Sequence, residues 1–415
     1  MSLQFITGNS GNGKTKYLFN RIVKEAKANP RDNYLVIVPE QFTMQTQRQL
    51  VDLSENKAIM NIDVLSFKRL AYRVFDELGI TNLTVLEETG KNLVLRKLAA
   101  QEADKLGVIG RNLNRIGYIS EVKSLLSELV QYNISPEELG RYIASGMLSD
   151  TLSDKLKDVL VLYEAFEKFM QDKYITAEEI LNVLSNVAEE SAILRNSVIA
   201  FDEFTGFTPI QNQLIKKLFV ISKKIYVTLT IDCREDIFKS RGMQELFDMP
   251  KRTVKSLTEM AAFYGIEVEE PIILDKNYRL AENEELSFME QQLFRKRRCS
   301  FKKAPKHIHI DCLRDPKQEL TKIARRINEL VRNENLRYRD IAIVTGDVNI
   351  YAGYVREIFD KYNIPYFIDA TQEILFHPFI EFIRSIPDIA AQNFSADAVF
   401  RFLRCGFSEL LDSEI

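Results

Sequence analysis

The chain has 415 residues, of which 46% are hydrophobic and 28% are charged, so it is long enough for two or three domains with sizeable cores. Its 56 basic and 59 acidic residues give a net charge of −3, which excludes the strongly basic surface of a simple nucleic-acid coat protein. The longest apolar runs are only as long as strands, and the N-terminus shows no signal-peptide pattern, so we expect a cytosolic protein with no membrane segment.

The first predicted element is a strand over Leu3–Thr7, followed directly by Gly8-Asn9-Ser10-Gly11-Asn12-Gly13-Lys14-Thr15 and a helical pattern. This octapeptide fits the phosphate-loop pattern G-x-x-x-x-G-K-[ST]. Its glycines let backbone N–H groups point at phosphate oxygens, Lys14 adds a charge for the β and γ phosphates, and Thr15 offers a hydroxyl to Mg²⁺. The pattern predicts ATP and Mg²⁺ as ligands, and a glycine-rich surface turn is the alternative. The predicted binding residues are Gly8, Gly11, Asn12, Gly13, Lys14 and Thr15.

Short apolar runs at 34–38 and 62–65 each lead into a helical pattern, which predicts a parallel α/β sheet. From about 87 to 196 the apolar spacing is helical instead, and strand patterns return at 197–201 and 225–230. We therefore expect an α/β domain that is interrupted by a helical insertion. The expected bounds are 1–86 and 197–270 for the α/β domain and 87–196 for the insertion.

The returning strand ends directly in Asp202 and Glu203. In a phosphate-loop fold, a carboxylate at the carboxyl end of a strand can hold the Mg²⁺ shell, and a second one beside it can orient the attacking water. The alternative is a helix N-terminus that carries favourable acidic residues. We predict Asp202 as a metal ligand together with Thr15, and Glu203 as a catalytic carboxylate.

A partial second α/β domain is expected at 271–380, with strands at 308–311 and 341–344 and a helix through 319–330. The helical pattern of 381–415 predicts the start of another insertion. Residues 295–306, called the basic stretch below, are expected to be a solvated linker, with a strip that contacts phosphates as the alternative.

Cysteines and histidines show no spacing typical of a metal or redox site. The cysteines are expected to be reduced thiols and the histidines to have structural roles. These residues are Cys233, Cys299, Cys312, Cys405, His307, His309 and His377.

The order of these motifs resembles the superfamily 1 helicases of the UvrD type, whose fold is RecA-like. The phosphate loop and Asp202-Glu203-Phe204, with Gln211 downstream, are similar to motifs I and II of those helicases, and Leu65–Ala71 is similar to their motif Ib. Leu274–Arg279 contains an Asn-Tyr-Arg triplet like that of motif IV. This resemblance implies that Arg279 reaches the γ-phosphate across a domain interface, and a surface arginine at a strand end is the alternative.

A closer resemblance, over essentially the whole chain, is to the AddB family, the B subunits of AddAB helicase/deoxyribonucleases. It implies a partner of the AddA type, a DNA substrate and a role in processing double-strand breaks for recombinational repair. The family's nuclease site and 4Fe-4S cluster lie in a C-terminal domain, so we expect this chain to be an N-terminal region without them. The collinear matches are Val38–Thr43, Phe204–Gln211, Glu290–Phe294, Tyr338–Ile343, Ile364–Asp369 and His377-Pro378.

Two departures from the motor helicases concern mechanism. Thr205 stands where those helicases carry a glutamine, and Pro39–Thr43 replaces a motif that contacts single-stranded DNA. We therefore expect an ATP-binding region of a helicase–nuclease subunit that is not itself a complete motor. One alternative is a phosphate-loop kinase that acts on a small molecule, and another is a structural subunit with a vestigial nucleotide site.

Overall fold

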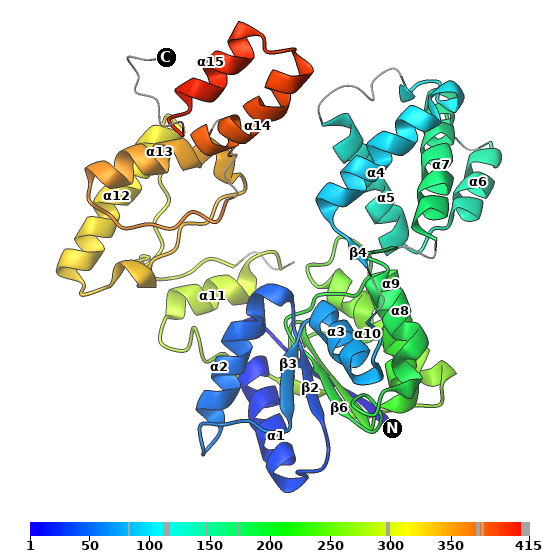
Figure 1. The fold of residues 1–415 in the computed structure, drawn as a ribbon. Coiled ribbons are helices and arrows are strands. Elements are labelled where there is room, and N and C mark those ends of the chain that lie inside the picture. The colour runs from blue at the N-terminus through cyan, green and yellow to red at the C-terminus, as the bar shows by residue number, and fades with distance from the viewer. Residues whose placement is uncertain are drawn as a thin grey trace. The chain divides into compact units, whose positions relative to one another are not determined.

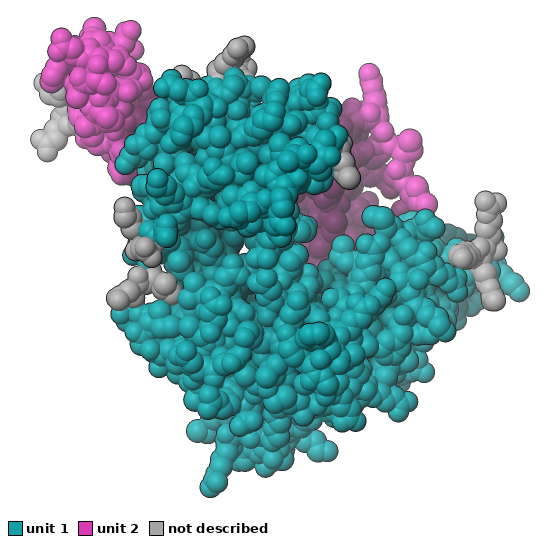
Figure 2. All heavy atoms as spheres, turned by 90° about the vertical axis from the view of Figure 1, so that its right-hand side faces the viewer, with its two compact units in different colours: residues 1–307 teal, residues 308–415 magenta. Residues whose placement is uncertain are grey.

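The computed structural model describes residues 1–81, 84–110, 117–146, 148–171, 174–295, 299–370, 374 and 377–407. They form two compact units, residues 1–307 and residues 308–415, which Figure 2 shows in different colours. None of the described helices is both long and apolar enough to cross a membrane.

The first unit is built on a parallel sheet of seven strands among the described residues, in the order β3-β2-β6-β7-β1-β8, with β9 also pairing with β1 (Figure 1). All five strands expected here from the sequence are confirmed. Burial of every residue in the two strands β2 and β6 is typical of a parallel sheet that is covered on both faces. The strands are β1 (Ser2–Gly8), β2 (Tyr34–Ile37), β3 (Ile62–Leu65), β6 (Val198–Phe201), β7 (Lys224–Thr230), β8 (Glu267–Val268) and β9 (Ile272–Leu274).

Helices cover both faces of this sheet (Figure 1). Successive side chains of a strand point to opposite faces, so Phe5 joins the core under one layer of helices and Ile6 the core under the other. The layer over Ile6 contains α1 (Lys14–Ala28) and α2 (Thr43–Leu53). The layer over Phe5 contains α3 (Phe67–Leu78), α8 (Ile180–Val187), α9 (Pro209–Ile221) and α10 (Asp248–Phe263).

The helical insertion has a core of its own, separate from the two cores of the sheet. It joins the sheet domain through a short parallel pair of strands, β4 (Val85–Leu86) and β5 (Ile175–Thr176). Helix α8 lies inside the expected range 87–196 but packs on α3 and α9, so Ile180 and Leu184 belong to a core of the sheet. The helices of the insertion are α4 (Glu88–Gln101), α5 (Tyr118–Gln131), α6 (Pro136–Ala144) and α7 (Asp150–Met170).

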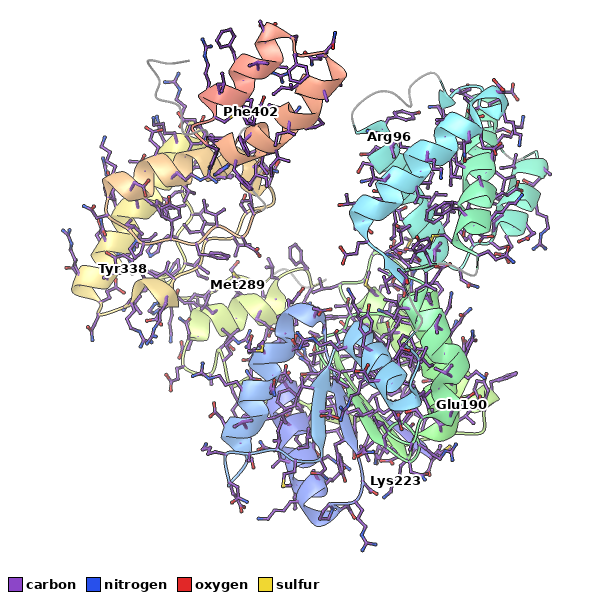
Figure 3. The ribbon with its side chains drawn as sticks, in the orientation of Figure 1. Arg96, Glu190, Lys223, Met289, Tyr338 and Phe402 are labelled. Atoms are coloured by element: carbon purple, nitrogen blue, oxygen red, sulfur yellow. The ribbon has the colours of Figure 1, made fainter. Side chains whose placement is uncertain are left out.

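Strand β9 and helix α11 (Glu284–Gln292) belong to the first unit, although the sequence placed the start of a second domain at residue 271. The reason is the parallel pairing of β9 with β1, which adds this segment to the first sheet. Figure 3 labels Met289 on α11.

The basic stretch agrees with the solvated-linker prediction over most of its described length, since residues 299–300 and 302–306 are exposed, but it is anchored at both ends. Arg295 forms an ion pair with the buried Asp232 at 2.8 Å, and its own side chain is only 15% exposed. At the other end, the carboxylate of Glu285 accepts hydrogen bonds from the backbone N–H groups of Lys306 and the next residue. Residues 296–298 lie outside the described residues.

In the second unit, α12 and α13 pack around a small core that includes Leu320, Ala324 and Phe359. The helix expected through 319–330 and the helical pattern after residue 380 are confirmed. The helices are α12 (Pro316–Asn333), α13 (Val348–Lys361), α14 (Pro378–Ala391) and α15 (Ala396–Arg404). Short 3₁₀ turns elsewhere in the described chain span Glu40–Phe42, Ala103–Lys105, Ala188–Glu190 and Tyr338–Asp340.

The two strands expected in this second unit, at 308–311 and 341–344, are not formed, and this prediction is wrong. A strand is stabilised by backbone hydrogen bonds to a neighbouring strand, and the described residues of this unit contain no such ladder. Side chains that would face a core are exposed instead: Ile310 is 94% exposed and Val344 is 92% exposed. The apolar pattern is present, but it does not provide a strand with its pairing partner.

Candidate nucleotide-binding site

A cavity of about 740 Å³ lies at the carboxyl edge of the first sheet, where β1 runs through the phosphate loop into α1. Lys223, labelled in Figure 3, precedes β7 and therefore marks the opposite edge of this parallel sheet. The residues that line the cavity are Ser10, Gly11, Gly13, Lys14, Thr15, Lys16, Phe19, Gln49, Asp52, Leu53, Asp202, Glu203, Phe204, Thr205, Thr228, Thr230, Tyr278 and Arg279.

The phosphate loop needs glycine at two positions for different reasons. Gly13 is the N-cap of α1 and has φ +77°, in the left-handed region that side chains rarely adopt. Gly11 has φ +88°, and a Cβ added there would lie 2.7 Å from Oδ1 of Asn277 and 2.8 Å from Cβ of Arg279. The loop therefore depends on glycine both for its curl and for the close approach of residues 277–279.

Residues 277–279, the Asn-Tyr-Arg triplet, lie directly on the phosphate loop. The Nδ2 group of Asn277 donates to the carbonyl of Ser10 at 3.0 Å, and the backbone N–H of Tyr278 donates to the carbonyl of Gly11 at 3.0 Å. The pairing of β9 with β1 explains this, since it delivers the chain beside the loop.

Arg279 donates from Nη1 to Oγ of Ser10 at 3.4 Å and lines the cavity. The resemblance to motor helicases placed this arginine across a domain interface, but it belongs to the same compact unit as the phosphate loop. The difference again follows from β9, which is part of the first sheet.

The ammonium group of Lys14 lies at the base of the loop. Its Nζ donates to the carbonyl oxygens of Gly8 at 3.1 Å and Asn9 at 3.0 Å. Burial lowers the pKa of Lys14, against the carboxylates of Glu203 and Asp202, which raise it. Lys14 and the acidic pair thus line one cavity and influence one another's charge.

Asp202 follows β6 and is only 1% exposed. Its Oδ1 accepts a hydrogen bond from the hydroxyl of Thr228 on β7, whereas Oδ2 has no hydrogen-bond partner among the described residues. Burial raises the pKa of Asp202, and the bond from Thr228 opposes this by favouring the ionised form.

Glu203 has φ +64°, which is uncommon for a residue other than glycine and is found mostly where surrounding structure enforces it, often at functional sites. This backbone turn directs its carboxylate to the loop, where Oε1 accepts a hydrogen bond from the Thr15 hydroxyl at 3.3 Å. Oxygen donors of Thr15, Asp202 and Glu203 are the hard ligands that Mg²⁺ prefers, and Oδ2 of Asp202 is a buried carboxylate oxygen without a hydrogen-bond partner among the described residues. The residues present therefore fit Mg²⁺.

Gly8 and Asn12, which were predicted to bind the nucleotide, do not line the cavity. Both pack against Leu274: the Nδ2 group of Asn12 donates to its carbonyl at 2.5 Å, and a Cβ at Gly8 would meet that carbonyl at 2.6 Å. Their role in this structure is to join the loop to β9. Gln211 lies outside the cavity as well, in the capping box of α9 with Thr208.

Several residues line the cavity without having been predicted to do so. Thr228 and Thr230 belong to a strand that the sequence predicted, but only the register of β6 with β7 reveals that Thr228 neighbours Asp202. Three residues of α2, at positions 49, 52 and 53, line the cavity without any motif to signal them.

Asp232, just beyond the end of β7, anchors the loops behind the cavity. Its side chain is 2% exposed, and its carboxylate accepts hydrogen bonds from Arg234 at 2.6 Å and from Arg295 at 3.0 Å. Burial by itself raises the pKa of Asp232, but the bonds and charges of the two arginines outweigh it and lower that pKa to about 2.

We expect Asp232→Asn to lower the free energy of unfolding by about 2 kcal/mol at pH 7, since the folded pKa lies well below the unfolded value of about 3.9. The depressed pKa makes this a contribution that is present above pH 4 and lost as the pH falls to 2. Urea titrations at several pH values test it, with the exposed Asp154→Asn as control. A stability difference that is absent at pH 7, or that persists undiminished at pH 2, would contradict the prediction.

The parallel sheet with helices on both faces, and a phosphate-loop sequence at its carboxyl edge, define an α/β protein with a cavity of ligand size. A family model described as the N-terminal part of ADDB matches residues 5–290. The chain therefore belongs to the AddB family.

Curated proteins similar to this chain are named as the B subunit of an ATP-dependent helicase/deoxyribonuclease. The protein of Lachnoclostridium phytofermentans is 38% identical, that of Caldanaerobacter subterraneus 34% and that of Clostridium tetani 32%. Each match covers 100% of this chain but 36% of the relative, so the chain spans about a third of their length.

Proposed function

We propose that this chain binds Mg·ATP at the phosphate loop, as the nucleotide-binding region of a helicase/deoxyribonuclease B subunit. The observation that carries the proposal is the convergence of Lys14, Asp202 and Glu203 on one cavity of about 740 Å³ with the glycine loop. A cation and two carboxylates that line one cavity with a loop of this sequence suit a triphosphate and its metal ion.

In this proposal the loop N–H groups and Lys14 bind the β and γ phosphates, while Thr15 and Asp202 hold Mg²⁺. The metal, when bound, would neutralise charge on the phosphates. Glu203 orients the attacking water, and Arg279 lies at the cavity wall, in reach of the γ-phosphate. The dipole of α1 adds a favourable field for the anion.

The wider role that we propose is that of the family: processing of double-strand DNA breaks for recombinational repair, with DNA as substrate and an AddA-type helicase/nuclease subunit as partner. The names of the relatives support this. We assign the parallel sheet a RecA-like fold and expect the 4Fe-4S cluster and nuclease site of the family outside these residues.

We also propose that the region is not a complete motor. Thr205 lines the cavity but its side chain is too short to replace the glutamine of motor helicases. Glu40, in the segment that replaces a DNA-contacting motif, accepts a hydrogen bond from Ser66 at 3.2 Å and lies 3.6 Å from Nε of Arg69. This carboxylate partly neutralises the charge of Arg69.

Calorimetric titration of the chain with ATP, with and without Mg²⁺, tests the proposal. We expect binding that Mg²⁺ strengthens, and no binding in either condition would favour a structural subunit with a vestigial site. DNA-stimulated ATP hydrolysis by the assembled complex then separates the proposed role from a small-molecule kinase, whose turnover would respond to a phosphate acceptor and not to DNA.

A further inference from the structure

The hydroxyl of Thr228 donates to one oxygen of Asp202, while the other oxygen of that carboxylate has no partner among the described residues. Both side chains are almost fully buried, Thr228 being 3% exposed and Asp202 1%. They come from the neighbouring parallel strands β6 and β7. The register pairs Phe201 with Val227, so the next residues along, Asp202 and Thr228, lie side by side.

An aspartate carboxylate rotates through a broad range about its last torsion unless a donor fixes it. The bond from Thr228 is of the charge-assisted kind, which is short and directional. With Oδ1 occupied, Oδ2 is the oxygen without a hydrogen-bond partner among the described residues, and Asp202 lines the same cavity as Thr15 and Glu203.

We propose that Thr228 is a positioning residue, which holds the Asp202 carboxylate so that Oδ2 is presented to the metal ion of a bound nucleotide. The inference rests on the proposed Mg·ATP site and adds to it a residue that acts through Asp202. Removing the hydrogen-bond partner of a metal-ligating side chain commonly weakens metal affinity by about 10-fold to 100-fold.

The test is the dependence of ATP binding on Mg²⁺ concentration, measured by calorimetry on the whole chain. Thr228→Val keeps the shape but removes the donor, so the Mg²⁺ concentration for half-maximal strengthening of ATP binding should rise about 10-fold to 100-fold. ATP affinity without metal should stay within about twofold of wild type, because Thr228 does not bind phosphate in this proposal. Thr228→Ser, which keeps the hydroxyl, should restore the wild-type Mg²⁺ dependence.

Thr7→Val is the matched control. Thr7 lies on the adjacent strand β1, is 1% exposed, and its hydroxyl has no hydrogen-bond partner among the described residues. The same isosteric change there should leave the Mg²⁺ dependence as in wild type. If Thr228→Val behaves like Thr7→Val, the inference is overturned while the nucleotide site stands.

A double-mutant cycle with Asp202→Asn adds a measurement that separates positioning from a purely structural role: whether the effect of Thr228→Val on the Mg²⁺ dependence requires Asp202. In the Asp202→Asn background, Thr228→Val should have no further effect on the Mg²⁺ dependence, and an additive effect would overturn the positioning role. Should Thr228→Val not fold, Thr228→Cys, whose thiol is a weak donor, takes its place. A wild-type chain that binds no ATP would instead overturn the proposed function, and the inference with it.

Discussion

Lys14→Ala is expected to abolish measurable binding of Mg·ATP by the chain. The substitution leaves the backbone donors of the loop in place but removes the ammonium group that the structure holds at its base, 3.1 Å from the Gly8 carbonyl. Removing a charge-assisted hydrogen bond from a buried site costs about 3 kcal/mol or more, which is a factor of over about a hundred in affinity.

Calorimetry on wild type and variant measures this effect, and thermal unfolding of both proteins verifies that the fold is intact. Lys24→Ala is the control, because Lys24 is an exposed lysine of the same helix that does not line the cavity. Equal ATP affinity for wild type and Lys14→Ala would mean that the loop does not bind the phosphates of ATP through Lys14.

Glu203→Gln is expected to leave ATP binding unchanged and to slow hydrolysis by about 10²-fold to 10⁴-fold, the contribution of a positioned general base. Glutamine preserves the shape of the side chain and tolerates the backbone at φ +64° no worse than glutamate. Only the charge and basicity that orient a water molecule are removed.

This experiment needs the full-length subunit assembled with the proposed AddA-type partner. Any nucleotide site of that partner is inactivated, so that a single site can react. A single-turnover measurement then reports on Glu203 alone, with the exposed Glu259→Gln on α10 as control. If wild type and Glu203→Gln turn over ATP at the same rate, ATP acts as a structural ligand here and the vestigial-site alternative is the better one.

The sheet could be predicted because its strands are short apolar runs whose neighbours in the chain are helices, a pattern that depends only on local sequence. The loop and Asp202-Glu203 could be predicted because both follow strands directly. The approach of residues 277–279 to the loop could not be predicted from the sequence. It depends on the pairing of β9 with β1, which lie more than 260 residues apart.

Two departures from the sequence predictions have the same physical origin. The anchoring of Arg295 to Asp232 depends on a contact between distant loops, which charge alone cannot indicate. The expected strands at 308–311 and 341–344 had the apolar composition of strands, but strand formation depends on a partner that composition cannot identify.

The two short strands that carry the helical insertion bear on the order of folding. Pairing of Leu86 with Thr176 closes a loop of roughly ninety residues, and each doubling of a flexible loop costs about 0.6 kcal/mol of chain entropy. If the insertion collapses first around its own core, its two ends are already adjacent, and the remaining closure is that of a link of a few residues. The entropic cost of that closure is then smaller by about 3 kcal/mol. An insertion that folds in this order therefore lowers the entropic cost of pairing β2 with β6, even though it separates these strands in the sequence.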